Sequence, residues 1–82
     1  MEHALKIAPV HFAAVADGLK HAELRANDRA FNVGDKITLS EYRMQVGYTG
    51  ECVDVVITHI AEVGFIAPGY VLLSIELLRD GN

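Results

Sequence analysis

The sequence predicts a small, mainly β domain of the α+β type: a five-stranded, largely antiparallel barrel with one short helix. Five segments show the alternation or the Val- and Ile-rich composition of strands, and a single segment has helical spacing. The pattern contains no crossover helices, which argues against a parallel sheet. Closing the sheet into a barrel would remove the exposed edges of so apolar a sheet. With 82 residues, 51% of them hydrophobic, the chain is expected to form one domain over residues 1–82.

The chain begins with a predicted strand and a short helix. Residues 3–8 alternate in polarity, so that Leu5 and Ile7 share one face. Pro9 suits the first turn of a helix, because a backbone N–H would have no partner there. Apolar residues then follow at helical spacing up to an Asp-Gly pair, and we expect a helix over residues 9–17.

A second alternating segment, residues 20–25, follows the helix. The alternation predicts that Ala22 and Leu24 face the core, whereas Glu23 and Arg25 share the opposite face. A lysine at position 20 would lie on the face opposite Glu23 if the strand began there. Because a flexible glycine precedes it, we expect this lysine beside the helix end, where the strand starts.

The rest of the chain predicts a turn-rich connection and three more strands. Residues 26–35 are rich in turn formers, with Phe31 and Val33 as expected anchors. The strands are expected at residues 36–43, 52–63 and 70–78, with a hairpin-like connection around Gly47 and Gly50 and a turn at residues 67–69. The predicted core collects the apolar residues of the helix and strands: Leu5, Ile7, Phe12, Val15, Leu24, Ile37, Leu39, Val55, Ile57, Val71, Leu73, Ile75 and Leu77.

The charge distribution limits the kind of partner. The net charge is −4, and the chain has no long basic stripe of the kind that a general duplex-binding protein needs. Residues 18–43 nevertheless contain five basic and four acidic residues, whereas the remainder contains two basic and seven acidic residues. The cations are therefore concentrated where a local anion-binding site could form.

No motif predicts a metal, a cofactor or a membrane partner. The four histidines lack metal-ligand spacing, and a glycine-rich phosphate loop and a serine nucleophile motif are both missing. The single cysteine, Cys52, excludes an internal disulfide and is expected to be a buried, inert thiol. Apolar runs are too short for a membrane span and the first residues do not resemble a signal peptide, so a cytoplasmic location is expected.

Residues 18–25, Gly-Leu-Lys-His-Ala-Glu-Leu-Arg, match the pattern G-x-K-x-x-E-x-R at all four fixed positions. The chain here resembles the ASCH domain family, relatives of the PUA RNA-binding domains. An F-x-x-G-D segment follows at residues 31–35, and the terminal segment Gly-Tyr-Val-Leu-Leu-Ser-Ile-Glu-Leu-Leu completes the likeness. Over residues 5–78 the chain is similar to the small bacterial and phage branch of PUA-like proteins, the DUF3850 type of domain with unknown function.

The resemblance implies a PUA-like barrel with a cleft lined by the motif, and RNA or a modified nucleoside as ligand. Arg25 offers a planar fork of donors suited to a phosphate or a base edge. Glu23 could hold that fork in place or accept a hydrogen bond from a base amino group. Tyrosines near the motif could stack a base. The candidate ligand-binding residues are Lys20, Glu23, Arg25, Arg29, Tyr42 and Tyr48.

Three other interpretations stay open. Glu23 and Arg25 could form only a surface ion pair, worth at most about 1 kcal/mol. The resemblance also includes small enzymes, so that Lys20 and Glu23 could act in an amidohydrolase on an acylated cytidine or in a ribonuclease. In the deacetylating branch, however, a threonine stands where this chain has Glu23, and the branch's later glutamate has no counterpart. Finally, a phage-type domain of this size could bind a protein partner, and either a monomer or a weak dimer is expected.

Overall fold

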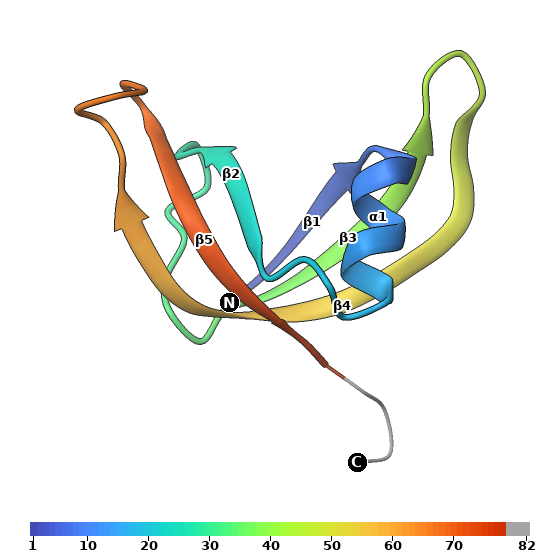
Figure 1. The fold of residues 1–82 in the computed structure, drawn as a ribbon, viewed down its shortest axis with the longest axis horizontal. Coiled ribbons are helices and arrows are strands. Elements are labelled where there is room, and N and C mark those ends of the chain that lie inside the picture. Colours follow the sequence, from blue (N-terminus) through green and yellow to red (C-terminus); the bar gives the residue numbers. More distant parts are fainter. Residues whose placement is uncertain (79–82) are drawn as a thin grey trace.

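The computed structural model describes residues 1–78 as a single curled β-sheet with one helix (Figure 1). The predicted domain of residues 1–82 therefore extends four residues beyond the described part. The mainly β fold with five strands and one short helix is confirmed. The elements are β1 (Glu2–Ile7), α1 (Pro9–Ala16), β2 (Ala22–Ala26), β3 (Lys36–Arg43), β4 (Gly47–Glu62) and β5 (Tyr70–Leu77).

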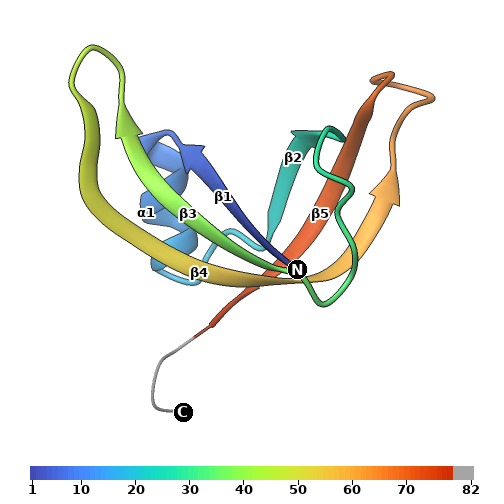
Figure 2. The ribbon, with the colours of Figure 1, turned by 180° about the vertical axis from the view of Figure 1, so that it is seen from behind.

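The strand order in the sheet is β1-β3-β4-β5-β2. β1 and β3 are parallel and the other neighbours are antiparallel, so the largely antiparallel sheet is as predicted. The long strand β4 sweeps through the middle, and the sheet curls into a half-barrel whose edge strands β1 and β2 lie on either side of its open side (Figures 1 and 2). No backbone ladder joins β1 to β2 in residues 1–78, so this opening separates two sheet edges.

The curvature of β4 follows from how the strand is shared. Its first part pairs with β3 and its last part pairs with β5. The register with β3 shifts between Ser40 and Tyr42, and the register with β5 shifts between Ile57 and His59. Such irregularities bend a strand and increase its twist, which lets one strand serve both halves of the sheet.

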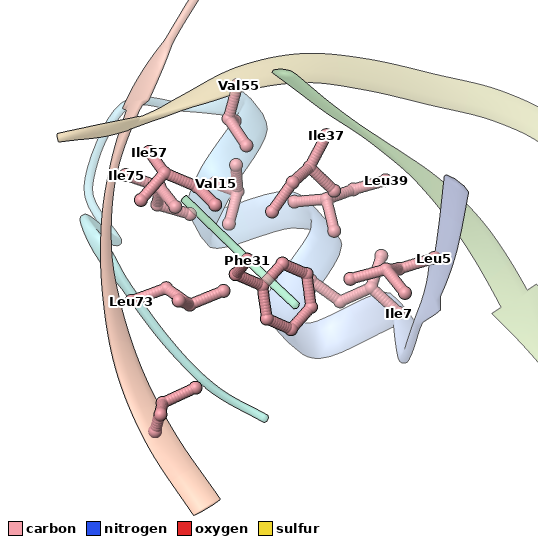
Figure 3. Close-up of a cluster of buried hydrophobic side chains, with 11 residues drawn as sticks. Leu5, Ile7, Val15, Phe31, Ile37, Leu39, Val55, Ile57, Leu73 and Ile75 are labelled. Atoms are coloured by element: carbon pink, nitrogen blue, oxygen red, sulfur yellow. The ribbon is translucent and has the colours of Figure 1, made fainter. Parts of the chain in front are cut away.

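The core fills the concave side of the sheet, where α1 packs against β3 (Figure 3). Val15 of α1 is buried among residues from β1, β3, β4 and β5. All residues of the predicted core except Leu24 belong to this cluster or pack against it. Phe12 and Leu77 are partly buried against it, and Phe31 joins it as expected. The buried members are Leu5, Ile7, Val15, Phe31, Ile37, Leu39, Val55, Ile57, Val71, Leu73 and Ile75.

Several local predictions were wrong. Leu24 is 55% exposed and Val33 is 61% exposed, so neither belongs to the core. Cys52 was expected to be buried but is exposed. Side chains alternate along β4, so that Val53 and Val55 point inward and Cys52 lies on the outer face of the sheet. The hairpin turn occupies residues 44–46 and does not lie around Gly47 and Gly50, because both glycines belong to β4.

Candidate functional site

A buried carboxylate holds two cations at the open side of the half-barrel. Glu23 of β2 is 7% exposed. Its Oε1 accepts from Lys20 Nζ at 2.6 Å, and its Oε2 accepts from Arg25 Nε at 2.9 Å and lies 2.7 Å from Arg25 Nη2. The structure therefore brings together the three polar residues of the motif.

The orientation of β2 is the reverse of the predicted one. Glu23 and Arg25 share a face as expected, but this face points to the interior, and Leu24 points outward. The prediction placed the apolar residues of this strand inside. A carboxylate can take the inner position here because two cations and two hydrogen bonds offset the loss of its hydration.

The end of α1 places Lys20. Gly18 adopts a left-handed conformation, with φ 76°, and the backbone N–H groups of Leu19 and Lys20 both donate to the carbonyl of Ala14. Lys20 thus lies in the turn before β2, as expected, and the alternation of the strand does not govern its direction. Its ammonium group also donates to the carbonyl of Ala22.

Two arginines bridge the open side between the edge strands. Arg25 Nη2 donates to the carbonyl of Lys6 at 2.8 Å, and Arg29 Nη1 donates to the carbonyl of Ala4 at 3.3 Å. Both acceptors belong to β1, two residues apart on its unpaired edge. Arg29 also lies 3.8 Å from the exposed carboxylate of Asp28. Side chains from the β2 side therefore partly replace the missing backbone ladder.

The cluster has N–H donors without a hydrogen-bond partner and few free acceptor atoms. Its side chains remain 23% exposed at Arg25 and 26% exposed at Lys20. Within residues 1–78, the Nη1 group of Arg25 has no hydrogen-bond partner, and Lys20 uses two of its three N–H groups. Two cations and one carboxylate leave one net positive charge. Such a site favours ligands with acceptor atoms, such as phosphate oxygens or the carbonyl and ring-nitrogen atoms of a base.

Tyr42 and Tyr48 form a separate group on β3 and β4. They are cross-strand partners whose ring centroids are 5.1 Å apart in an edge-to-face arrangement. The Nζ of Lys6 lies 4.5 Å from the centroid of Tyr42. In the described part of the chain neither tyrosine contacts the Glu23 cluster directly, although the carbonyl of Lys6 accepts from Arg25. Sequence reasoning missed Lys6, whose only signal was its isolated charge in an apolar strand.

The F-x-x-G-D segment has a structural role. Its Asp35 is buried and accepts from His3 Nε2 at 2.8 Å and from the backbone N–H of Asn32 at 3.0 Å. The α-amino group of Met1 lies 3.2 Å from the same carboxylate. Phe31 packs edge-to-face on the His3 ring. These contacts tie the start of β1 to the turn before β3.

These contacts predict how stability depends on pH. The hydrogen bonds from His3 and from the backbone of Asn32 lower the pKa of Asp35 from 3.8 to about 2. A carboxylate whose pKa is lowered by folding stabilises the folded state at pH values above its ordinary pKa of 3.8. This contribution is lost as the pH falls from about 4 through 2. We expect Asp35→Asn to lower stability at neutral pH and to remove this part of the acid dependence in denaturant titrations.

The exposed Asp17 supplies the control for that experiment. Asp17→Asn should shift the curves little at any pH, since this carboxylate is exposed at the end of α1. Parallel acid-unfolding curves for Asp35→Asn and the unmodified chain would contradict the assignment.

Residues 1–78 contain neither a cluster of metal ligands nor a membrane-spanning helix. No three histidine, cysteine, aspartate or glutamate side chains gather there as possible metal ligands. The helix of this part of the chain is also too short to cross a membrane.

The fold and the Lys-Glu-Arg cluster around the buried Glu23 together define a small β half-barrel with a polar, cation-rich opening. Comparison with known proteins assigns the chain to a family. Residues 2–75 match the domain of unknown function DUF3850, and the chain belongs to this family. It is also 35% identical over 71 residues to a protein of Escherichia phage P2 described as an uncharacterized 12.9 kDa protein in the GpA 3′ region. The match covers 87% of this chain and 64% of that phage protein's length.

Proposed function

We propose that this chain is a PUA-like domain of the ASCH type that binds single-stranded RNA or a nucleotide-sized ligand at Lys20, Glu23 and Arg25. One observation carries the proposal: a buried carboxylate holds two cations, and within residues 1–78 each cation keeps N–H donors without a partner, at Nη1 of Arg25 and at one N–H of Lys20. A surface ion pair would need neither the burial of Glu23 nor its second cation. The motif G-x-K-x-x-E-x-R supports the ligand class through its resemblance to the ASCH family.

Glu23 acts in this proposal as a brace for the two cations. Its Oε2 accepts from Arg25 Nε and lies 2.7 Å from Arg25 Nη2, and its Oε1 accepts from Lys20, so that one lone pair of Oε1 is left for a ligand donor. Recognition therefore depends mainly on Lys20 and Arg25 as donors. Because so few cations take part, the affinity should fall only slowly with salt, with a slope equivalent to about one to three phosphates.

Replacing Arg25 with alanine should weaken the binding of a short single-stranded RNA. The loss of a charged, forked donor is worth roughly 1–3 kcal/mol, or about 5- to 150-fold in the dissociation constant. Fluorescence anisotropy of labelled oligonucleotides measures the change, with Arg43→Ala as the matched control, since Arg43 is an exposed arginine at the end of β3. Equal losses in the two variants would indicate unspecific attraction and contradict the proposal.

The enzymatic alternatives require Lys20 as a base. Its Nζ donates to Glu23 at 2.6 Å and also donates to a backbone carbonyl, and both contacts use Lys20 as a donor, whereas a base must present an acceptor to its substrate. We therefore expect no turnover of acetylated cytidine or of RNA at high protein concentration. Hydrolysis that disappears in Lys20→Ala would favour the amidohydrolase or ribonuclease.

One observation favours a protein-binding module as the second candidate. Leu24 and Leu72 are cross-strand partners on the outer face of β2 and β5, and both are exposed. Tyr70 extends this uncharged surface, and Phe65 and Ile66 are exposed in the connection between β4 and β5. Exposed apolar patches of this kind often mark protein contacts. If the chain works in this way, RNA should leave its spectrum unchanged and the apolar face should respond to a partner.

A further inference from the structure

A cavity of about 300 Å³ opens where β1 passes into α1, beside the end of β3. Its wall is mainly apolar, and the backbone that forms part of it is stiffened by Pro9 at the first turn of the helix. The volume lies at the small end of the roughly 300–1,000 Å³ found for small-molecule sites. The lining residues are Lys6, Ile7, Ala8, Pro9, Tyr42 and Met44.

The cavity combines a flat aromatic wall with a single cation. The Nζ of Lys6 lies 4.5 Å from the centroid of the Tyr42 ring, while Tyr48 supports that ring from β4. No acidic side chain lines the cavity, and in the described residues Glu41 is engaged by Thr49 at 2.7 Å. A ligand that fits must therefore have a flat, apolar part and an anionic group close to it.

Lys6 also connects this cavity to the Glu23 cluster. Its carbonyl accepts the hydrogen bond from Arg25, whereas its exposed side chain reaches the tyrosine. The two sites thus share one residue of the β1 edge. A chain of nucleotides bound at the opening of the half-barrel would meet Arg25 and the cavity in succession.

We infer that the cavity beside Tyr42 is the base-binding subsite for one nucleotide of the ligand, and that Lys6 pairs with the phosphate of this nucleotide. The inference deepens the proposed function and rests on it. The base replaces the Lys6 ammonium on the face of Tyr42. The ammonium then exchanges a cation–π contact for a stronger, charge-assisted hydrogen bond to phosphate. Base stacking on tyrosine tolerates any base, so sequence preference at this position is weak.

The test uses cytidine 5′-monophosphate, adenosine 5′-monophosphate, cytidine and inorganic phosphate as separate probes. NMR follows the Met44 methyl group and the Lys6 and Tyr42 signals during each titration. We expect both nucleotides to shift these signals, cytidine to shift them with weaker affinity, and phosphate alone to leave Met44 unchanged. Tyr42→Ala should weaken nucleotide binding by roughly 10- to 100-fold, and Tyr42→Phe should restore it.

Three further variants separate the roles of the residues. Lys6→Met keeps the length of the side chain and the carbonyl that Arg25 uses, so it should bind nucleotide and nucleoside with equal affinity. Lys6→Arg should recover the preference for nucleotide. Tyr70→Ala, a half-exposed tyrosine on β5 that is remote in the strand order, should bind as the unmodified chain does.

Other outcomes of the titrations would overturn the subsite alone or the proposed function as well. Shifts confined to residues 18–29 would leave the proposed function standing and overturn the subsite. Shifts at Met44 with phosphate alone, or unchanged binding in Tyr42→Ala, would also overturn it. If neither nucleotides nor short RNA perturb the spectrum, both the subsite and the proposed function are wrong.

Discussion

Glu23→Ala is expected to lower the free energy of unfolding by roughly 2–3 kcal/mol. Removing one member of a buried ion pair typically costs about 3–5 kcal/mol, because the remaining charge is left without compensation. Lys20 and Arg25 are about one-quarter exposed, so water hydrates part of each cation in the variant and the expected loss falls at or below the bottom of that range. Chemical denaturation at neutral pH measures the loss.

Glu76 provides the matched control for this carboxylate. It lies on β5, next in the sheet to β2, but its side chain is exposed. Glu76→Ala should change stability by less than about 0.5 kcal/mol, as is usual for surface positions. If Glu23→Ala costs no more than this control, the carboxylate is a surface group and the inward orientation of β2 is wrong.

Leu73→Ala is expected to cost roughly 2–5 kcal/mol of unfolding free energy, the range for a fully buried leucine. Leu73 is 0% exposed at the centre of β5 and pairs with Glu23 on β2. The truncation leaves a cavity between the two halves of the sheet, because neighbouring core residues relax only partly.

Leu24 tests the same part of the sheet from its other face. Leu24→Ala should cost less than about 1 kcal/mol, since the side chain is 55% exposed. A conventional reading of the alternation in β2 predicts the opposite order, with a large loss at Leu24. Comparable losses for the two leucines would contradict the orientation of β2 described above.

The sequence was sufficient for most of the fold, because alternation and helical spacing reflect burial directly. Leu5 and Ile7 lie inside as their alternation requires, and α1 begins at Pro9 as expected. The failures have physical causes. Leu24 was placed inside because apolar side chains usually are, whereas the pairing of Glu23 with two cations makes the polar face the inner one.

The candidate site was predictable only in part. The motif named Lys20, Glu23 and Arg25, and the structure joins them. The bridges from Arg25 and Arg29 to β1 depend on the curvature of the sheet, which is set by long-range pairing that no local pattern encodes. For the same reason the sequence could not place Lys6 over Tyr42, since 36 positions separate them in the chain.

The most direct test of the central claim is an NMR titration of the labelled protein with a short single-stranded RNA. Binding at the proposed site should shift the side-chain signals of Arg25 and Lys20 and the backbone signals of residues 18–29 first. The shifts should saturate, weaken only slowly with salt, and require a higher RNA concentration in Arg25→Ala. An RNA titration that leaves these signals in place, or that perturbs only the outer face around Leu24 and Leu72, would contradict the account.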